Sequence, residues 1–179
     1  APETLTADIG LLGGGEMAAF TTVSGGTGTA PRLLGDMFAE VANTHPDRVA
    51  VVDGNGAALT YAELDARSNQ LARWLISRGI GVESLVALAI GRSVELLTAI
   101  WAVTKTGAGY VPIDPDYPAE RVANMIEDSG AILGLTVRTG ELPGDEFEWV
   151  RLDGDSTRAT IADLSDAAVS AVEMSGRVR

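Results

Sequence analysis

Few residues in this sequence have the types and spacing that chemistry at a site requires. A Ser-Gly-Gly-Thr-Gly run at 24–28 could wrap backbone N–H groups around a phosphate. Such a loop needs a strand before it and a helix N-terminus directly after it. No strand pattern precedes this run, Pro31 separates it from the next helical pattern, and no lysine follows it closely. We therefore predict that the run belongs to a linker.

Two carboxylates, Asp114 and Asp116, flank Pro115 after an apolar run that is typical of a strand. Ligands of α/β proteins gather at the carboxyl ends of strands, and Mg²⁺ prefers oxygen ligands such as carboxylates. Only two such ligands are present, however, and Asp is a common turn residue. The pattern favours a stiff structural turn over a metal site.

The chain has a single histidine and a single lysine. His45 lies at the predicted end of a helix without a Ser or Cys partner in a recognisable motif, so a structural or surface position is expected. Lys105 lies near the end of another predicted helix, where a cation interacts favourably with the last carbonyls. Packing roles are expected for the three tryptophans, Trp74, Trp101 and Trp149.

Composition narrows the function classes further. The 179 residues are 46% hydrophobic, and 13 basic and 25 acidic side chains give a net charge of −12. One globular core is expected, whereas nucleic acids and anionic membranes are poor partners because no basic cluster exists. The lack of cysteine excludes disulfides, thiolate metal sites and a cysteine nucleophile. Neither a long apolar run nor a signal-peptide pattern is present, so a cytoplasmic protein is expected.

The elements that must position these residues alternate along the chain. Apolar residues at helical spacing predict helices over 33–45, 60–79, 93–107 and 118–130. Short apolar runs predict strands over 48–53, 57–60, 84–90, 109–114, 131–136 and 147–153. Such alternation is typical of βαβ units. The predicted fold class is α/β, with a mostly parallel sheet flanked by helices and an irregular stretch before residue 33.

The helix over 60–79 has the clearest local signals. Thr60 and Glu63 have the spacing of a capping box, in which each side chain bonds the other residue's backbone N–H. Gly79 is a candidate C-cap. The apolar face is expected to contain Leu64, Leu71, Leu75 and Ile76. The solvent face is expected to contain Arg67, Asn69, Gln70 and Arg73.

Two segments go beyond these patterns. LTYAEL at 59–64, with the helix after it, resembles the first core motif of amino-acid adenylation domains in non-ribosomal peptide synthetases. VTKTGAGYVPIDPDYPAERV at 103–122 resembles their second core motif. PDRVAVV at 46–52 resembles the usual lead-in, and Arg92-Ser93-x-Glu95 fits the stretch between the motifs. The resemblance extends over about 30–155, and the preceding residues resemble the linker that follows a condensation domain.

The resemblance implies the fold of the large N-terminal subdomain of adenylate-forming, AMP-binding enzymes. Ten residues match core-motif positions for which structural roles are expected: Leu59, Thr60, Tyr61, Glu63, Leu64, Lys105, Gly107, Tyr110, Pro112 and Asp114. Thr106 and Gly109 stand where alanine is more usual in the family. No catalytic, cofactor-binding or metal-binding residue is assigned within the chain.

The resemblance also implies an activity for the parent protein. It would activate an amino acid with ATP and Mg²⁺ as an aminoacyl-AMP and load it on the phosphopantetheine of a carrier protein. The family's Gly-rich ATP loop follows both motifs, so it is expected beyond 179. The run at 24–28 precedes both motifs and therefore does not match the position of that loop. We expect a linker over 1–32 and the N-terminal part of an adenylation domain over 33–179. That part is expected to be a scaffold without activity of its own.

Other interpretations stay open. Acyl-CoA synthetases and carboxylate reductases share the family fold, and a non-catalytic interaction module on a truncated fold would also fit. An adenylation domain interrupted by an inserted domain after 179 is a third alternative. The implied partners are the preceding condensation domain, the remainder of the adenylation domain and a carrier protein. Uncovered apolar surfaces would lead to a homodimer or to aggregation.

Overall fold

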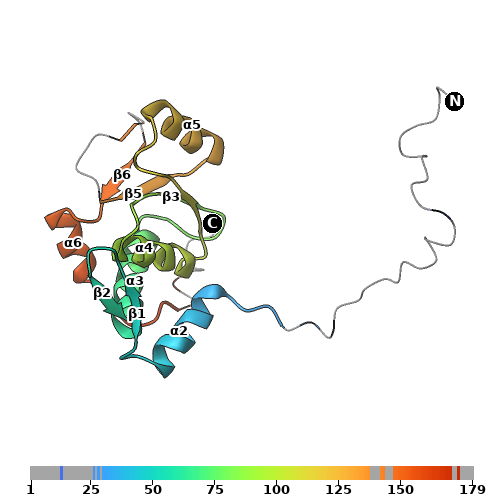
Figure 1. Ribbon diagram of the computed structural model, residues 1–179, viewed down its shortest axis with the longest axis vertical. Coiled ribbons are helices and arrows are strands. Elements are labelled where there is room, and N and C mark those ends of the chain that lie inside the picture. The colour runs from blue at the N-terminus through green and yellow to red at the C-terminus, as the bar shows by residue number, and fades with distance from the viewer. Residues whose placement is uncertain are drawn as a thin grey trace. The chain divides into compact units, whose positions relative to one another are not determined.

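The computed structural model describes residues 13, 26, 28, 30–137, 142–143, 147–170 and 173 (Figure 1). The chain divides into two compact units, Ala1–Pro31 and Arg32–Arg179. Every helix and strand described below belongs to the second unit. The predicted linker, with its Gly-rich run, lies mostly outside the described residues.

A four-stranded parallel sheet forms the centre of the second unit. Its strands, in the spatial order β4-β3-β5-β6, are β3 Leu85–Ala89, β4 Gly109–Pro112, β5 Leu133–Thr136 and β6 Trp149–Arg151. In this register Val86 of β3 lies between Tyr110 of β4 and Leu133 of β5. β3 and β5 are nearly continuous apolar runs because both of their faces are covered. The predicted mostly parallel sheet is confirmed.

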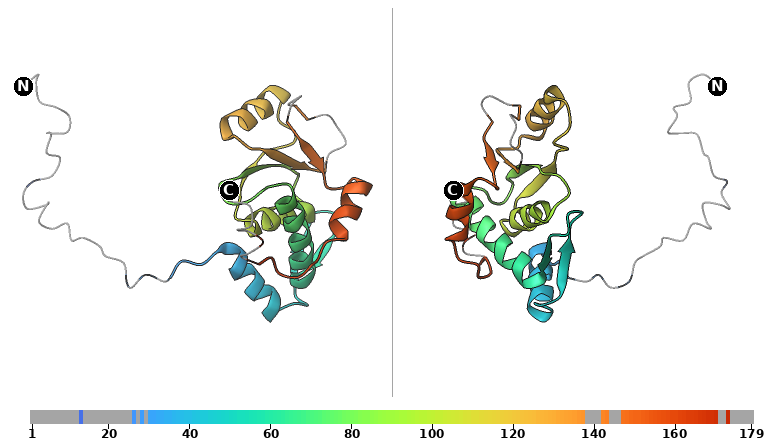
Figure 2. Two further views of the ribbon diagram at one scale, coloured as in Figure 1. Left: turned by 180° about the vertical axis from the view of Figure 1, so that it is seen from behind. Right: turned by 60° about the vertical axis from the view of Figure 1, so that its left-hand side comes forward.

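Helices cover both faces of the sheet, which gives three layers. The bounds are α3 Tyr61–Ser77, α4 Val94–Lys105, α5 Ala119–Ser129 and α6 Asp155–Ala162. Side chains alternate along β3, so Val86 and Leu88 pack against α3 and α4, while Ala87 and Ala89 face α5. Figures 1 and 2 show α5 on one side of the sheet and α3 and α4 on the other. In the described part of the chain, no helix combines the length and apolar character that crossing a membrane requires.

A β-hairpin and a further helix pack against the start of α3. β1 Val49–Val52 and β2 Ala58–Thr60 match two of the strands that the short apolar runs predicted, and they pair antiparallel. The carboxylate of Asp53 accepts backbone N–H bonds from Asn55 and Ala57 at 2.9 Å and so closes the turn. α2 Leu34–Thr44 contributes Phe38 to a small core with Leu59 and Leu64.

The predicted start and stop signals of α3 are both present. The Glu63 N–H donates to Thr60 Oγ1 at 3.2 Å, and the Thr60 N–H donates to Glu63 Oε2 at 2.8 Å, which completes the capping box. At the other end Gly79 has φ +85°, and its N–H donates to the Ile76 carbonyl. The Ile80 N–H reaches the Leu75 carbonyl at 3.1 Å, so the helix ends in a Schellman motif.

The predicted solvent face of α3 is partly wrong. Leu64, Leu71 and Leu75 are buried and Arg67 is exposed, as expected. Asn69, however, is only 1% exposed, and Gln70 and Arg73 are half-buried. The reason is tertiary, because the segment after α6 returns along this face and bonds all three polar side chains.

Candidate functional site

The residues of the first motif, 59–64, form a cap and part of a core. Leu59 and Leu64 are buried with Phe38, whose ring centroid lies 6.1 Å from that of Tyr61. Thr60 and Glu63 make the capping box. These side chains hold α2, the hairpin and α3 together.

The second motif connects α4 closely to β4. A side chain at Gly109 would place its Cβ 2.8 Å from Leu85 Cδ2, and Gly107 has φ +81°. Tyr110 is 42% exposed, and Pro112 is exposed at the end of β4. Asp114 Oδ1 accepts the Asp116 N–H at 3.0 Å, which is the predicted turn. Within the described ranges, no group of three or more acidic or histidine side chains could hold a metal ion.

The other residues that the sequence singled out have structural positions. His45 is exposed at the end of α2, and its backbone N–H donates to the Val41 carbonyl. Trp101 stacks on Phe38 with 4.1 Å between ring centroids, and Trp149 packs edge-on against Phe147. Trp74 is 8% exposed in the largest core cluster. The predicted packing roles of the tryptophans are confirmed.

Lys105 lies in the last turn of α4, as predicted, but it does not cap that helix. Its side chain is 6% exposed and crosses to α3. There Nζ lies 2.7 Å from Asp65 Oδ1, 2.7 Å from Ser68 Oγ and 2.8 Å from Asn69 Oδ1. The Asp65 carbonyl lies 3.2 Å from the same atom. The expectation of a cation at a helix terminus is corrected, because the packing of α3 against α4 buries this end.

Two opposing effects act on the charge of Lys105. Burial lowers the pKa of the Lys105 ammonium below its usual value, and the ion pair with Asp65 partly offsets that shift. The surrounding oxygens suit the ammonium, which donates three hydrogen bonds and accepts none. No buried side-chain nitrogen or oxygen in the described part of the chain is without a partner. Lys105 is therefore a satisfied buried cation that joins α3 to α4.

The same polar cluster continues into the chain after α6. Asn69 Nδ2 donates to Asp65 Oδ2 at 3.0 Å and to the Asp166 carbonyl at 2.8 Å. Arg73 donates to three further carbonyls, those of Ser165, Ala167 and Ala168. It also pairs with Glu173 at 2.9 Å. Sequence reasoning missed these contacts because a polar stripe on a helix looks the same whether water or backbone covers it.

A cavity of about 660 Å³ opens at the carboxyl-terminal edge of the sheet. Val137 follows β5, Leu152 follows β6, and Val94 and Thr98 belong to the first turns of α4, which follows β3. β4, which follows β3 in sequence, lies on one side of β3. β5 lies on its other side, with β6 beyond it, so the connections run in opposite directions and this edge is a topological switch point. The volume lies within the range of small-molecule sites.

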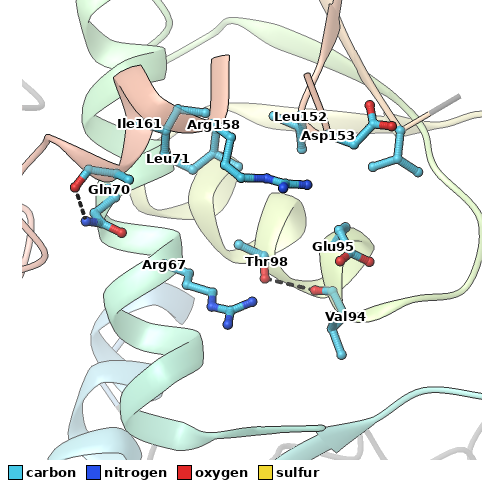
Figure 3. A pocket seen from close by; sticks show the side chains of 12 residues that line it. Arg67, Gln70, Leu71, Val94, Glu95, Thr98, Leu152, Asp153, Arg158 and Ile161 are labelled. Carbon is cyan, nitrogen blue, oxygen red and sulfur yellow. Dashed lines mark hydrogen bonds between the residues drawn. The ribbon is translucent and has the colours of Figure 1, made fainter. Parts of the chain in front are cut away.

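The walls of this cavity have balanced charge. Figure 3 shows Arg67 of α3 and Arg158 of α6 reaching into it. Neither guanidinium has an ion pair or hydrogen bond with the described residues. Glu95 and Asp153 line the opposite wall, so the cavity does not select one sign of charge. Its residues come from distant parts of the chain, and no local pattern predicted it.

Comparison with known proteins adds a family assignment to this geometry. The profile described as AMP-binding enzyme matches residues 38–174. Bacitracin synthase 3 of Bacillus licheniformis is 44% identical over 119 residues, which are 66% of this chain and 2% of that protein. Phosphinothricin tripeptide synthetase PhsC of Streptomyces viridochromogenes is 40% identical over 134 residues, which are 74% of this chain and 12% of that protein. The chain thus spans a small part of these curated relatives.

Solved structures share the fold. The N-terminal subdomain of Klebsiella oxytoca NpsA in complex with 3-hydroxybenzoyl-AMSN has a TM-score of 0.67 and 25% identity, over 80% of this chain and 36% of that one. An artificially fused adenylation–PCP di-domain, NpsA-ThdA from Klebsiella oxytoca, has a TM-score of 0.66 and 25% identity. The match covers 78% of this chain and 25% of the fusion.

Proposed function

Because the chain belongs to the AMP-binding enzyme family, we propose that residues 33–179 form the first part of a synthetase adenylation domain. The observation that carries this proposal is the family match over 38–174, which contains both core motifs in order. The likeness to the NpsA N-terminal subdomain supports it. The parent protein would convert an amino acid and ATP into an aminoacyl-AMP, and residues 1–32 would be the linker from a condensation domain.

The role of this part is that of a scaffold. In such a reaction, catalysis comes from aligning carboxylate and α-phosphate and from stabilising the developing charge. The resemblance implies that the family's Gly-rich ATP loop lies beyond residue 179, and Lys105 is enclosed by Asp65, Ser68 and Asn69. We therefore assign nucleotide and metal binding to residues of the parent outside the described ranges.

The partners follow from the same proposal. The fused adenylation–PCP neighbour supports a carrier protein as partner, whose phosphopantetheine thiol would take the aminoacyl group as a thioester. A preceding condensation domain is supported by the resemblance of the first residues to such a linker. The proposed compartment is the cytoplasm.

Amino-acid-dependent ATP–pyrophosphate exchange tests the proposal. The assay compares the 179-residue chain with a longer chain that continues in the same reading frame. We expect exchange only in the longer chain, and the amino acid that supports it identifies the substrate. Exchange by the 179-residue chain would contradict the scaffold role. Exchange driven by fatty acids would instead indicate an acyl-CoA synthetase or carboxylate reductase. Two folded but inactive chains would favour an interaction module.

A further inference from the structure

The segment 163–170, which we call the strap, is held to α3 almost entirely through its backbone. Each carbonyl from Leu164 to Ala168 accepts a hydrogen bond from an α3 side chain. Gln70 donates to the Leu164 carbonyl and Asn69 to the Asp166 carbonyl. Arg73 donates to the carbonyls of Ser165, Ala167 and Ala168. The pairing fixes the course of the strap independently of its side chains.

Apolar contacts contribute little to this attachment. Of the strap residues only Leu164 and Val169 are half-buried, and both lie at the margin of the large core cluster. All the others are exposed. Segments with few buried apolar contacts open at low free energy, so the side-chain bonds from α3 decide whether the strap is docked.

Asn69 is the point where the strap joins the buried polar cluster. Its Oδ1 accepts from Lys105 Nζ at 2.8 Å, and its Nδ2 donates to Asp65 Oδ2 and the Asp166 carbonyl. An ammonium can bond only the oxygen of an amide. Lys105 and the Asp65 carboxylate, which can accept only from the amide nitrogen, therefore fix the orientation of the amide together, with its nitrogen towards the strap.

From this arrangement we propose that Lys105 is a positioning residue for the strap and acts through Asn69. Lys105 itself makes no hydrogen bond to the strap within the described residues. It orients the amide, and the amide fixes the Asp166 carbonyl at the middle of the five bonded carbonyls. A buried cation on α4 thus sets the path of a segment some 60 residues later in the chain. The inference does not depend on the adenylation activity.

A direct route from Lys105 to the strap must be separated from this one. Lys105, Ala168 and Val169 line the same small cavity of about 80 Å³. Loss of the Lys105 side chain could therefore loosen the strap by packing alone. The two routes differ in whether the effect of Lys105 requires Asn69.

Thiol labelling of the strap tests the proposal. The chain has no cysteine, so Val169→Cys adds a single thiol at a half-buried strap position. Its labelling rate in native buffer reports strap opening. In this background we expect Lys105→Met and Asn69→Ala each to raise the rate about two- to tenfold, the range for one neutral hydrogen bond. The double variant should label no faster than Asn69→Ala alone.

Controls separate strap opening from general loss of stability. Arg78→Gln removes an exposed ion pair with Glu148 at the end of the same helix and should leave the rate unchanged. Arg73→Gln removes three direct strap bonds and should raise it. Asn69→Asp keeps the side-chain size and the acceptor for Lys105 but cannot donate to Asp166, so it should also raise the rate. This variant tests the bond between Asn69 and the strap without changing Lys105, so that step stays testable if Lys105→Met fails to fold.

Two outcomes would overturn the proposal. A Lys105→Met rate equal to that of the Val169→Cys reference would show that Lys105 does not position the strap. Additive effects of Lys105→Met and Asn69→Ala would show that Lys105 acts through packing and not through the amide. Neither outcome bears on ATP–pyrophosphate exchange, so the two proposals fail separately.

Discussion

Lys105 shows how burial changes the meaning of a residue type. As the only lysine of the chain, and near a predicted helix end, it matched the pattern of a surface cation. In the structure its ammonium lies 5.2 Å from the centroid of the Phe38 ring and contacts four oxygens of α3. The charge is enclosed by α3 partners that are 36 to 40 residues away in sequence.

This enclosure predicts that the Lys105 amine is unreactive in the folded protein. An amine-reactive ester should modify the native chain at its terminal amine only, because the Lys105 side chain is 6% exposed and its protons are shared with α3. Unfolding in urea should add one further label. Intact-mass spectrometry counts the labels, and peptide mapping locates them. Rapid labelling of Lys105 in the native chain would contradict the buried network.

Gly134 provides a second test at the scale of one residue. A Cβ there would overlap the Trp149 ring and would lie 2.8 Å from Phe147 Cε1. Gly134→Ala should therefore lower the free energy of unfolding by about 2 kcal/mol, the usual cost of overpacking. The matched control is Gly91→Ala, where no atom lies within 4 Å and the change should stay within about 1 kcal/mol. Urea unfolding measures both, and equal stabilities would contradict the close packing of β5 against β6.

At the scale of elements, α3 organises the unit. Its start is fixed by the capping box, its apolar face packs on α4 and the sheet, and its polar face bonds the strap. Helix periodicity and the capping residues predicted the first two features. The bonds from the polar face of α3 could not be predicted, because they depend on the strap. The Ala- and Ser-rich sequence of the strap carries no strong signal of its own.

The capping box predicts a measurable loss of stability. Thr60→Ala removes the oxygen that accepts the Glu63 N–H, and the free energy of unfolding should fall by about 1 kcal/mol. Thr60→Ser keeps that oxygen and serves as the control. Thermal unfolding monitored by circular dichroism measures the difference. Identical melting temperatures for both variants would mean that the cap does not stabilise α3.

Glu63 makes part of this stability depend on pH. The backbone N–H of Thr60, and then its hydroxyl, hold the pKa of the Glu63 carboxyl below its usual value. A lowered folded-state pKa gives a contribution that is present above the unfolded-state pKa and is lost as the pH falls through the folded-state value. Glu63→Gln keeps an acceptor for the Thr60 N–H but cannot titrate. Its stability should fall less than that of the wild type on acidification from about pH 5.

Urea unfolding at several acidic pH values measures this difference. Glu127→Gln, at an exposed position of α5, is the matched control and should keep the wild-type slope. A Glu63→Gln variant with the wild-type slope would mean that the carboxylate does not stabilise the cap.

At the scale of the molecule, one surface stands out as uncovered. Leu33, Leu34, Met37 and Val41 of the α2 region are between 39% and 63% exposed. Leu34, Met37 and Val41 border an apolar groove of about 350 Å³ over Tyr61 and Trp101. Contiguous apolar patches of this kind mark interaction sites or aggregation hazards. Homodimer formation or aggregation therefore stays a prediction. The structure indicates the α2 surface as the contact region.

Light scattering tests this surface. The apparent mass of the 179-residue chain should rise with concentration, and Met37→Glu should reduce that rise because it places a charge in the patch. Asn43→Glu adds the same charge at an exposed position of α2 outside the patch and should have no effect. A constant monomer mass over the whole concentration range would contradict the prediction.

Local signals in the sequence were enough to predict the types, order and ends of most described elements. Periodicity, capping residues and glycines at helix ends act within a few residues. The signals for α3, β3 and α4 are therefore visible in the sequence itself. The core motifs also indicated the family that the profile match then established. The start of β5 and the end of β4 differ from the expected limits by two residues, because pairing decides where a strand stops.

The surroundings of the polar side chains, by contrast, depend on tertiary packing. Lys105 is buried because α3 crosses its helix, and Asn69 and Arg73 are covered because the strap returns over residues 92 to 97 positions earlier in the chain. The cavity at the sheet edge likewise joins α3, α4 and α6. Such contacts require distant segments to meet, and a local pattern cannot distinguish a polar side chain that faces water from one that faces backbone.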